Sequence, residues 1–238
     1  MTWSILARGE NGHLGVAIAS RFFSVGSLCV HTRRGVGAIA TQALMNPLYG
    51  EAGLELLAQG RSAAEVIAVL VAGDDGRAQR QVHVLPVHGT GAVHTGGECV
   101  DWCGHLLRDG FSVAGNMLAG ARVIEATAEA FATSHAPTLA ERLLDAMDAG
   151  EAAGGDKRGK QSAALRIHGD EDYLSLDLRV DDHANPLPEL RRLHVVSLER
   201  FQPFVSCLPG RDRPSGTIDR PTIEATIVRF HAARRGGK

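Results

Sequence analysis

The sequence predicts an α+β fold, a four-layer αββα sandwich in which two mainly antiparallel sheets lie face to face between pairs of helices. Two observations support this prediction. Segments that alternate between apolar and small or polar residues follow one another in groups, which is typical of antiparallel meanders. Helical patterns come in pairs between those groups, whereas a doubly wound parallel sheet alternates single strands with single helices. The expected order is three strands, two helices, two or three strands, two helices and two strands.

The chain is expected to begin with a β-hairpin. Apolar residues alternate with small ones over 14–20, another apolar segment covers 2–8, and Asn11-Gly12 between them is a strong signal for a tight turn. A third strand is expected over about 36–41. Later strands are expected over about 81–87, 91–94, 111–113, 162–167 and 173–180.

Capping residues mark the first pair of helices. Asn46 is a good N-cap with Pro47 at the first helical position, and Ser62 with Glu65 predicts a capping box for the next helix. Later helices are expected over about 121–133, 139–149 and 188–201. The tail is rich in Pro, Gly and Arg, so we expect one catalytic domain over residues 1–200 and a partly irregular C-terminal extension over 201–238.

Composition narrows the functional class. The 238 residues are 44% hydrophobic and 22% charged, and the net charge of −2 gives no overall attraction to nucleic acid or to an anionic membrane. No apolar stretch approaches the roughly 18 residues of a membrane span, and no signal-peptide pattern is visible. The four scattered cysteines are typical of reduced thiols. We expect a cytoplasmic homo-oligomer that needs no cofactor and whose partner is a small-molecule substrate.

The residue after the initiator methionine is the main candidate for chemistry. Removal of Met1 is permitted by a small second residue and would give Thr2 both a hydroxyl and a free α-amine. An α-amine has a pKa of roughly 7.7–8.0, so it can take the hydroxyl proton near neutral pH. Threonine follows methionine in many unrelated proteins, so the context matters. The expected hairpin brings Ser20 and Arg21 to Thr2, and Arg21 could bind a substrate carboxylate.

Other polar residues are expected to line the same cleft. Asn116 lies at a strand end and is the candidate oxyanion donor, although a turn-forming asparagine is the ordinary alternative. Gln42 follows the third strand. Asp156, Arg158 and Gln161 belong to a Gly-rich loop, where arginine can hold a carboxylate through two parallel hydrogen bonds. The alternative for that loop is a charged surface in contact with water.

Several blocks of sequence together resemble the family of unknown function DUF1028. The blocks are MTWSILAR at 1–8, LGVA at 14–17, GVGAIATQ at 35–42, NPLYG at 46–50, HTG at 94–96, GNMLAG at 115–120, GGDKRGKQSAAL at 154–165 and LRVDDH at 178–183. The resemblance extends over about residues 2–195 and implies an N-terminal-nucleophile (Ntn) hydrolase-like sandwich without assigning a reaction. Arg21 departs from the lysine of many relatives, so a proton-shuttling role there is not expected.

The leading hypothesis is an Ntn-type amidohydrolase that cleaves an amide C–N bond in a small carboxylate-bearing substrate through a Thr2 acyl-enzyme. One alternative is a catalytically silent protein of the same fold that binds a small molecule or assembles with partners. Another is a metal-assisted hydrolase, because Asp181, Asp182 and His183 follow the last expected strand. No G-x-S-x-G, H-E-x-x-H or phosphate-loop spacing occurs, which disfavours those hydrolase classes.

Overall fold

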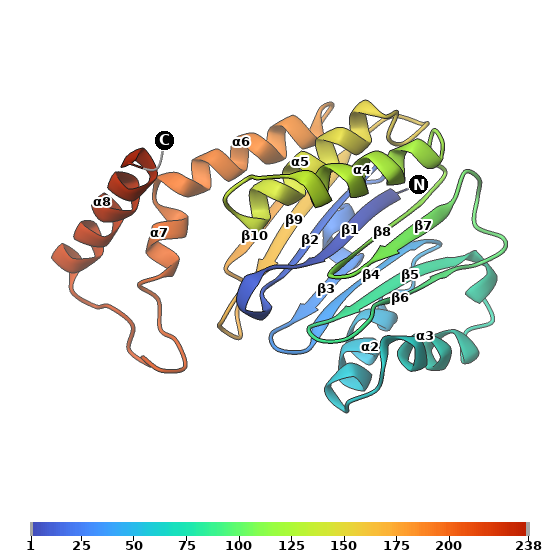
Figure 1. Cartoon of the computed structure of the whole chain (residues 1–238), viewed down its shortest axis with the longest axis horizontal. Coiled ribbons are helices and arrows are strands. Elements are labelled where there is room, and N and C mark those ends of the chain that lie inside the picture. The colour runs from blue at the N-terminus through green and yellow to red at the C-terminus, as the bar shows by residue number, and fades with distance from the viewer. Residues whose placement is uncertain (1, 237–238) are drawn as a thin grey trace. The chain divides into compact units, whose positions relative to one another are not determined.

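The computed structural model describes residues 2–236, and two antiparallel sheets form its centre (Figure 1). The larger sheet has six strands in the order β10-β9-β2-β1-β8-β7, and the smaller has four in the order β3-β4-β5-β6. The strands are β1 (Thr2–Arg8), β2 (Leu14–Ser20), β3 (Val30–Arg33), β4 (Gly37–Ala43), β5 (Arg80–Pro86), β6 (Ala92–Thr95), β7 (Gly104–Arg108), β8 (Phe111–Asn116), β9 (Ser162–His168) and β10 (Leu176–Val180).

Helix pairs cover the outer faces of both sheets. α4 (Ala121–Thr133) and α5 (Leu139–Ala152) pack on the larger sheet, and α2 (Leu48–Ala58) and α3 (Ala63–Ala72) pack on the smaller one. Figure 1 shows these pairs as the two outer layers. The predicted αββα sandwich is therefore confirmed. Every helix in the described range lacks either the length or the apolar character needed to cross a membrane.

Local signals in the sequence form the structures they predict. β1 and β2 make the expected hairpin, and in its connection Asn11 and Gly12 adopt positive φ angles of 56° and 77°. Asparagine and glycine tolerate this region better than other residues. The capping box is also present, because the Ser62 side chain accepts from the Glu65 amide while the Glu65 carboxylate accepts from Ser62.

Before the C-terminal tail, two strands and one short α-helix are absent from the sequence-based prediction. β3 and β7 lie at sheet edges, where partly exposed side chains leave little apolar alternation to detect. The helix α1 (Val25–Leu28) has only four residues, too few for a periodic pattern. The prediction was also wrong at the start of β10, which begins at Leu176 and not at Tyr173.

The space between the sheets is apolar at one end and polar at the other. A cluster of buried apolar side chains joins the sheets, including Leu6, Val16 and Ile18 of the larger sheet and Leu85 of the smaller one. A second cluster under α2 and α3 buries the other face of the smaller sheet. Toward the N-terminal end of β1, polar side chains replace the apolar ones, and this end holds the candidate site.

The chain divides into two compact units, one up to Leu190 and one from Arg191, with α6 (Pro186–Glu199) spanning the division. In the second unit, α7 (Phe201–Val205) packs against α8 (Arg220–Gly236). The tail is more regular than the loops expected from its composition. Asp219 provides the missed signal, since its carboxylate accepts the Thr222 amide at 2.9 Å and so caps α8.

The contact between α4, α5 and β1 depends on a glycine. A Cβ added at Gly150 of α5 would meet the Thr127 hydroxyl of α4 and come within 2.8 Å of the Trp3 indole nitrogen. We expect Gly150→Ala to lower the free energy of unfolding by about 1–3 kcal/mol through overpacking. Gly73→Ala is the matched control, because its added Cβ meets nothing within 4 Å. Denaturant unfolding should separate the two variants, and equal stabilities would contradict the proposed close packing.

Candidate functional site

Thr2 lies between two polar neighbours in the larger sheet. It pairs with Ser20 across β2 and with Asn116 across β8. The Thr2 and Ser20 hydroxyl oxygens are 3.1 Å apart, and all three residues are buried. The hairpin and the β1–β8 pairing thus bring together the predicted nucleophile, its neighbour and the predicted oxyanion donor.

These residues belong to a polar group on the inner faces of the two sheets. Side chains two apart on a strand share a face, so Thr2 and Ser4 both point toward the smaller sheet, where Ser4 contacts Gln42 and His83. We call the full set the inter-sheet polar group. Its members are Thr2, Ser4, Ser20, Gln42, Gln81, His83, Ser112 and Asn116. All eight are buried. A buried polar side chain needs a hydrogen-bond partner, so the bonds within this group matter for stability.

Gln81 is the central member of this group. Its carbonyl oxygen accepts from the Gln42 amide at 2.8 Å and from the Asn116 amide at 3.0 Å. Its own amide nitrogen donates to the carbonyl oxygens of Gly104 at 3.1 Å and Gly115 at 2.9 Å. These bonds fix the orientation of the side-chain amide groups of Gln42, Gln81 and Asn116. They also hold the Asn116 side chain beside Thr2, and they place Gln42, which we expected at the substrate cleft, inside this buried group.

His83 continues the group in a serine–histidine–serine arrangement. The Ser4 hydroxyl donates to the Gln42 carbonyl oxygen at 2.7 Å, so the His83 Nε2 hydrogen donates to Ser4 at 2.9 Å. His83 Nδ1 then accepts from the Ser112 hydroxyl at 2.8 Å. Burial lowers the pKa of His83 to about 3, so the ring is neutral. Because Ser4 gives its proton to Gln42 and has no access to solvent, this arrangement is structural and not a nucleophilic pair.

The Gly-rich loop is tied to the end of β2 by Asp156. This buried carboxylate accepts from the Arg21 backbone amide at 2.9 Å and from the Arg158 backbone amide at 2.8 Å. The Arg158 guanidinium also donates to this carboxylate at 3.4 Å and forms an ion pair with it. Asp156 therefore positions both arginines through their backbone and is not placed to contact a substrate directly.

Arg21 and Gln161 form a separate surface chain. The Arg21 guanidinium donates to Gln161 at 3.0 Å, and the Gln161 amide donates to Asp182 at 3.0 Å. Asp181 instead accepts from Arg179 and Ser24. His183 Nδ1 accepts from the Asn185 backbone amide at 3.0 Å, so the side chains of the three residues of the metal hypothesis are bound to different partners. Across residues 2–236, no three His, Cys, Asp or Glu side chains gather as they would around a metal ion.

A cavity of about 500 Å³ opens beside Asn116. Arg158 lines it, but Arg21 does not. Two wall residues have left-handed backbones without being glycine, Ala43 with φ of 67° and Met117 with φ of 53°. Cys99 also lines the cavity, and burial raises the pKa of its thiol, so it is not a thiolate nucleophile at neutral pH.

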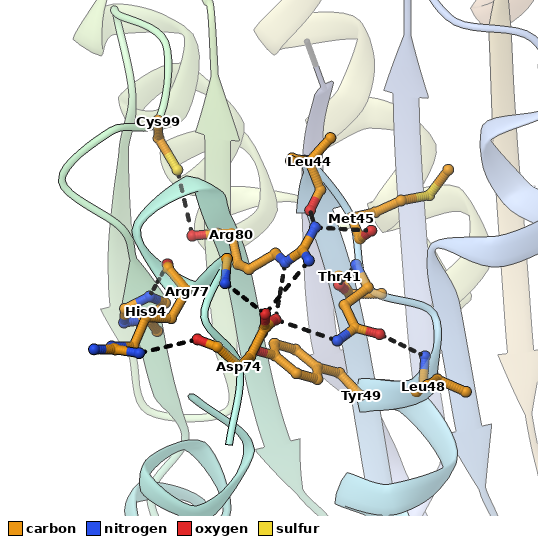
Figure 2. Close-up of polar contacts among 12 residues, drawn as sticks. Thr41, Leu44, Met45, Leu48, Tyr49, Asp74, Arg77, Arg80, His94 and Cys99 are labelled. Atoms are coloured by element: carbon orange, nitrogen blue, oxygen red, sulfur yellow. Dashed lines mark hydrogen bonds and ion pairs between the residues drawn. The ribbon is translucent and has the colours of Figure 1, made fainter. Parts of the chain in front are cut away.

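A partly buried ion pair holds one wall of this cavity (Figure 2). Arg80 donates to Asp74 at 2.9 Å, and the Tyr49 hydroxyl donates to the same carboxylate at 2.7 Å. The Arg80 guanidinium also donates to the carbonyl oxygens of Leu44 and Met45, the residues that follow β4. These bonds, from Arg80 first and Tyr49 second, hold the pKa of Asp74 well below its usual range. The loop after β4 is therefore fixed by a charge that persists at any pH near neutrality.

Sequence reasoning missed Ser4, Gln81, His83 and Ser112. A usable signal exists on β5, where Gln81 and His83 stand two apart and so share a face of a strand whose other inward residue, Leu85, is apolar. Two polar residues on one face of a buried strand indicate a polar patch inside the protein. Their partners lie on other strands, so the sequence does not identify them.

Fold and site together define an α+β sandwich of two antiparallel sheets with a buried threonine, second in the chain, at the polar end of its inter-sheet core. Within that class, the chain belongs to the family of unknown function DUF1028, whose model matches residues 2–190. No match was found among curated proteins.

Two solved structures are similar to the chain. Protein SPO2555 from Silicibacter pomeroyi, assigned to the same family model, is 30% identical with a TM-score of 0.85, over 92% of this chain and 96% of that one. Anbu (ancestral beta-subunit) from Yersinia bercovieri is 13% identical with a TM-score of 0.39, over 82% of this chain and 96% of that one.

The neutral His83 predicts a specific dependence of stability on pH. Its pKa of about 3 in the folded protein lies below the value of about 6.5 for an unfolded histidine, so between these values only the unfolded chain takes up the proton. Stability should therefore fall as the pH drops from 6.5. In His83→Gln, we expect the slope between about pH 6 and 5 to decrease by up to about 1.4 kcal/mol per pH unit.

Denaturant unfolding at several pH values measures this slope. His31, His105 and His168 also have lowered pKa values, and the wild type and the variant share them. Identical slopes in both proteins would mean that His83 gains a proton in the folded state as easily as in the unfolded one.

Proposed function

We propose that this protein is an Ntn-type amidohydrolase that cleaves an amide C–N bond in a small carboxylate-bearing substrate through a Thr2 acyl-enzyme. The observation that carries the proposal is the position of Thr2. It starts the central strand pair of the larger sheet, between Ser20 and Asn116, and a cavity opens beside Asn116. The Ser20 hydroxyl and the Asn116 amide are groups that can orient a hydroxyl nucleophile and stabilise a developing oxyanion.

Thr2 becomes a nucleophile if Met1 is removed. The new α-amine has a pKa of roughly 7.7–8.0 and takes the hydroxyl proton as Oγ1 attacks the amide carbon. The C–O bond to the acyl group forms, the C–N bond breaks, and the leaving nitrogen receives the proton. A water molecule then hydrolyses the ester and restores Thr2. The Ser20 hydroxyl, 3.1 Å from Thr2 Oγ1, can orient the attacking oxygen during both steps.

Asn116 supports the proposal as a source of oxyanion stabilisation. Its amide nitrogen carries two hydrogens, and the 3.0 Å bond to Gln81 uses one of them. That bond holds the amide rigidly, and a rigid donor stabilises a developing negative charge without reorganising. The role of Gln42 in this proposal is indirect, since it supports Gln81 and does not contact the reacting atoms.

Charge near the site favours an anionic group on the substrate. Arg158 lines the cavity next to Asn116 and can pair with a carboxylate. Arg21 and Gln161 lie on the neighbouring surface chain, where Arg21 adds positive potential at the end of β2. Arg158 is therefore the residue that we propose to orient the substrate.

The nucleophile hypothesis predicts that Thr2→Ala abolishes hydrolysis and that Thr2→Ser retains part of it. Loss of an attacking hydroxyl should cost several powers of ten in rate, at about 1.36 kcal/mol per tenfold. The assay is amine release from a panel of acyl-amino acids, ureido acids and amic acids. Thr133→Ala, at the exposed end of α4, is the control and should turn over normally. Undiminished turnover in Thr2→Ala would remove Thr2 from the mechanism.

The same hypothesis predicts that the mature protein begins at Thr2. Intact-mass spectrometry of protein purified from its native host should show the chain without Met1, because threonine at position two permits removal. A mass that corresponds to all 238 residues would leave Thr2 without the amine that the mechanism needs.

A further inference from the structure

The cavity beside Asn116 carries charges of both signs. Arg158 lines it, as the carboxylate-bearing substrate requires, but Glu98 lines it as well. A site that selects a simple anion gains nothing from a carboxylate in its wall, because like charges repel. The presence of Glu98 therefore carries information about the ligand that Arg158 alone does not.

Glu98 is available to a cationic group. Its side chain accepts a hydrogen bond from the Gln79 amide at 3.1 Å, and the residue is exposed. Among residues 2–236, no lysine, arginine or histidine forms an ion pair with it. A carboxylate that accepts one hydrogen bond from a neutral amide retains the capacity to accept further hydrogen bonds.

Arg158 is held at a defined position in the same cavity. Its backbone amide is bound to Asp156 at 2.8 Å, and its side chain is 40% exposed, so a ligand in the cavity can reach it. The guanidinium is planar and suited to carboxylate binding. The two charged groups thus project from different segments, the Gly-rich loop and the loop after β6.

Apolar side chains form much of the remaining wall. Leu44 and Val100 are 56% and 53% exposed, and Met117 lies beside Asn116. Exposed apolar residues gathered at a cavity favour a ligand with an apolar part.

We infer that this cavity binds a small zwitterion with an apolar side chain, of the class of free α-amino acids, with Arg158 binding the carboxylate and Glu98 the ammonium. As a statement about the substrate, the inference rests on the proposed function. The amide bond that Thr2 attacks is then a separate group of the same molecule. As a statement about binding, it holds whether or not Thr2 is a nucleophile.

Calorimetric titration of the wild-type chain with three matched probes tests the inference. Leucine carries both charges, 4-methylpentanoate only the carboxylate, and 3-methylbutylamine only the ammonium. None contains an amide, so turnover cannot affect the result, and a failure here is distinct from a failure of the Thr2 hypothesis. We expect leucine to bind more tightly than either singly charged probe, at millimolar or lower concentration.

Two variants assign the charges. Glu98→Gln should weaken leucine and 3-methylbutylamine binding roughly two- to fivefold, while 4-methylpentanoate binds unchanged or more tightly because a like charge has been removed. Arg158→Gln should weaken leucine and 4-methylpentanoate by a similar or larger factor, while the amine binds unchanged or more tightly for the same reason. Arg122→Gln and Glu129→Gln, an ion pair on the outer helix α4, are the controls and should change nothing.

Three results would overturn the inference. These are 4-methylpentanoate binding as tightly as leucine, leucine binding that Glu98→Gln does not alter, and no saturable binding of any probe at millimolar concentration.

Discussion

Eight polar side chains share the buried space between the two sheets, and each must find its hydrogen bonds there because water cannot supply them. Several of the bonds that satisfy them cross from one sheet to the other, from Ser4 to Gln42, from Ser112 to His83 and from Asn116 to Gln81. A shift of one sheet against the other would break several of these bonds together. The requirement to satisfy them therefore fixes the relative position of the sheets, and with it the surroundings of Thr2.

The orientation of each amide follows from the same requirement. Gln81 must present its nitrogen to the backbone carbonyl oxygens of Gly104 and Gly115, which leaves its oxygen facing Gln42 and Asn116. With the Gln81 oxygen in that position, the Gln42 amide nitrogen donates to it and the Gln42 oxygen accepts from Ser4. The Ser4 oxygen then accepts the Nε2 hydrogen of His83. The orientation of the Asn116 amide is therefore set through Gln81, a residue of the other sheet, and not by Asn116 itself.

The fold was accessible from the sequence because its signals are local. Alternation over 14–20, the Asn11-Gly12 turn and the Ser62 capping box each involve neighbouring residues, and each forms as predicted. The site was accessible only in part. The hairpin implies that Ser20 lies beside Thr2, but Asn116 reaches Thr2 through the β1–β8 pairing, which joins distant parts of the chain. Nothing local indicates which strand completes the sheet.

The loops were the least predictable part, because their conformation depends on distant partners. Asp156 reads as a substrate ligand in the sequence, yet its carboxylate is used to hold the backbone amides of Arg21 and Arg158. Although Asp156 binds the backbone of both arginines, their side chains lie in different surroundings. Arg158 remains at the cavity, while the Arg21 side chain turns to Gln161. A buried carboxylate that accepts hydrogen bonds from backbone N–H groups requires no particular residue spacing in the sequence. Neither composition nor periodicity can therefore reveal it.

Backbone conformation at the cavity links the buried bonds to the open surface. Ala43 and Met117 directly follow Gln42 and Asn116, the two amides that bind Gln81, and both have φ angles in the left-handed region. This conformation costs a residue with a Cβ roughly 1 kcal/mol or more, so it persists only where surrounding contacts enforce it. Here the residue before each of them is fixed by its side-chain hydrogen bond to Gln81. The loop after Ala43 is also fixed, because Arg80 donates to the Leu44 and Met45 carbonyl oxygens. β4 ends at Ala43 and β8 ends at Asn116, the residue paired with Thr2, and residues at both strand ends line the cavity.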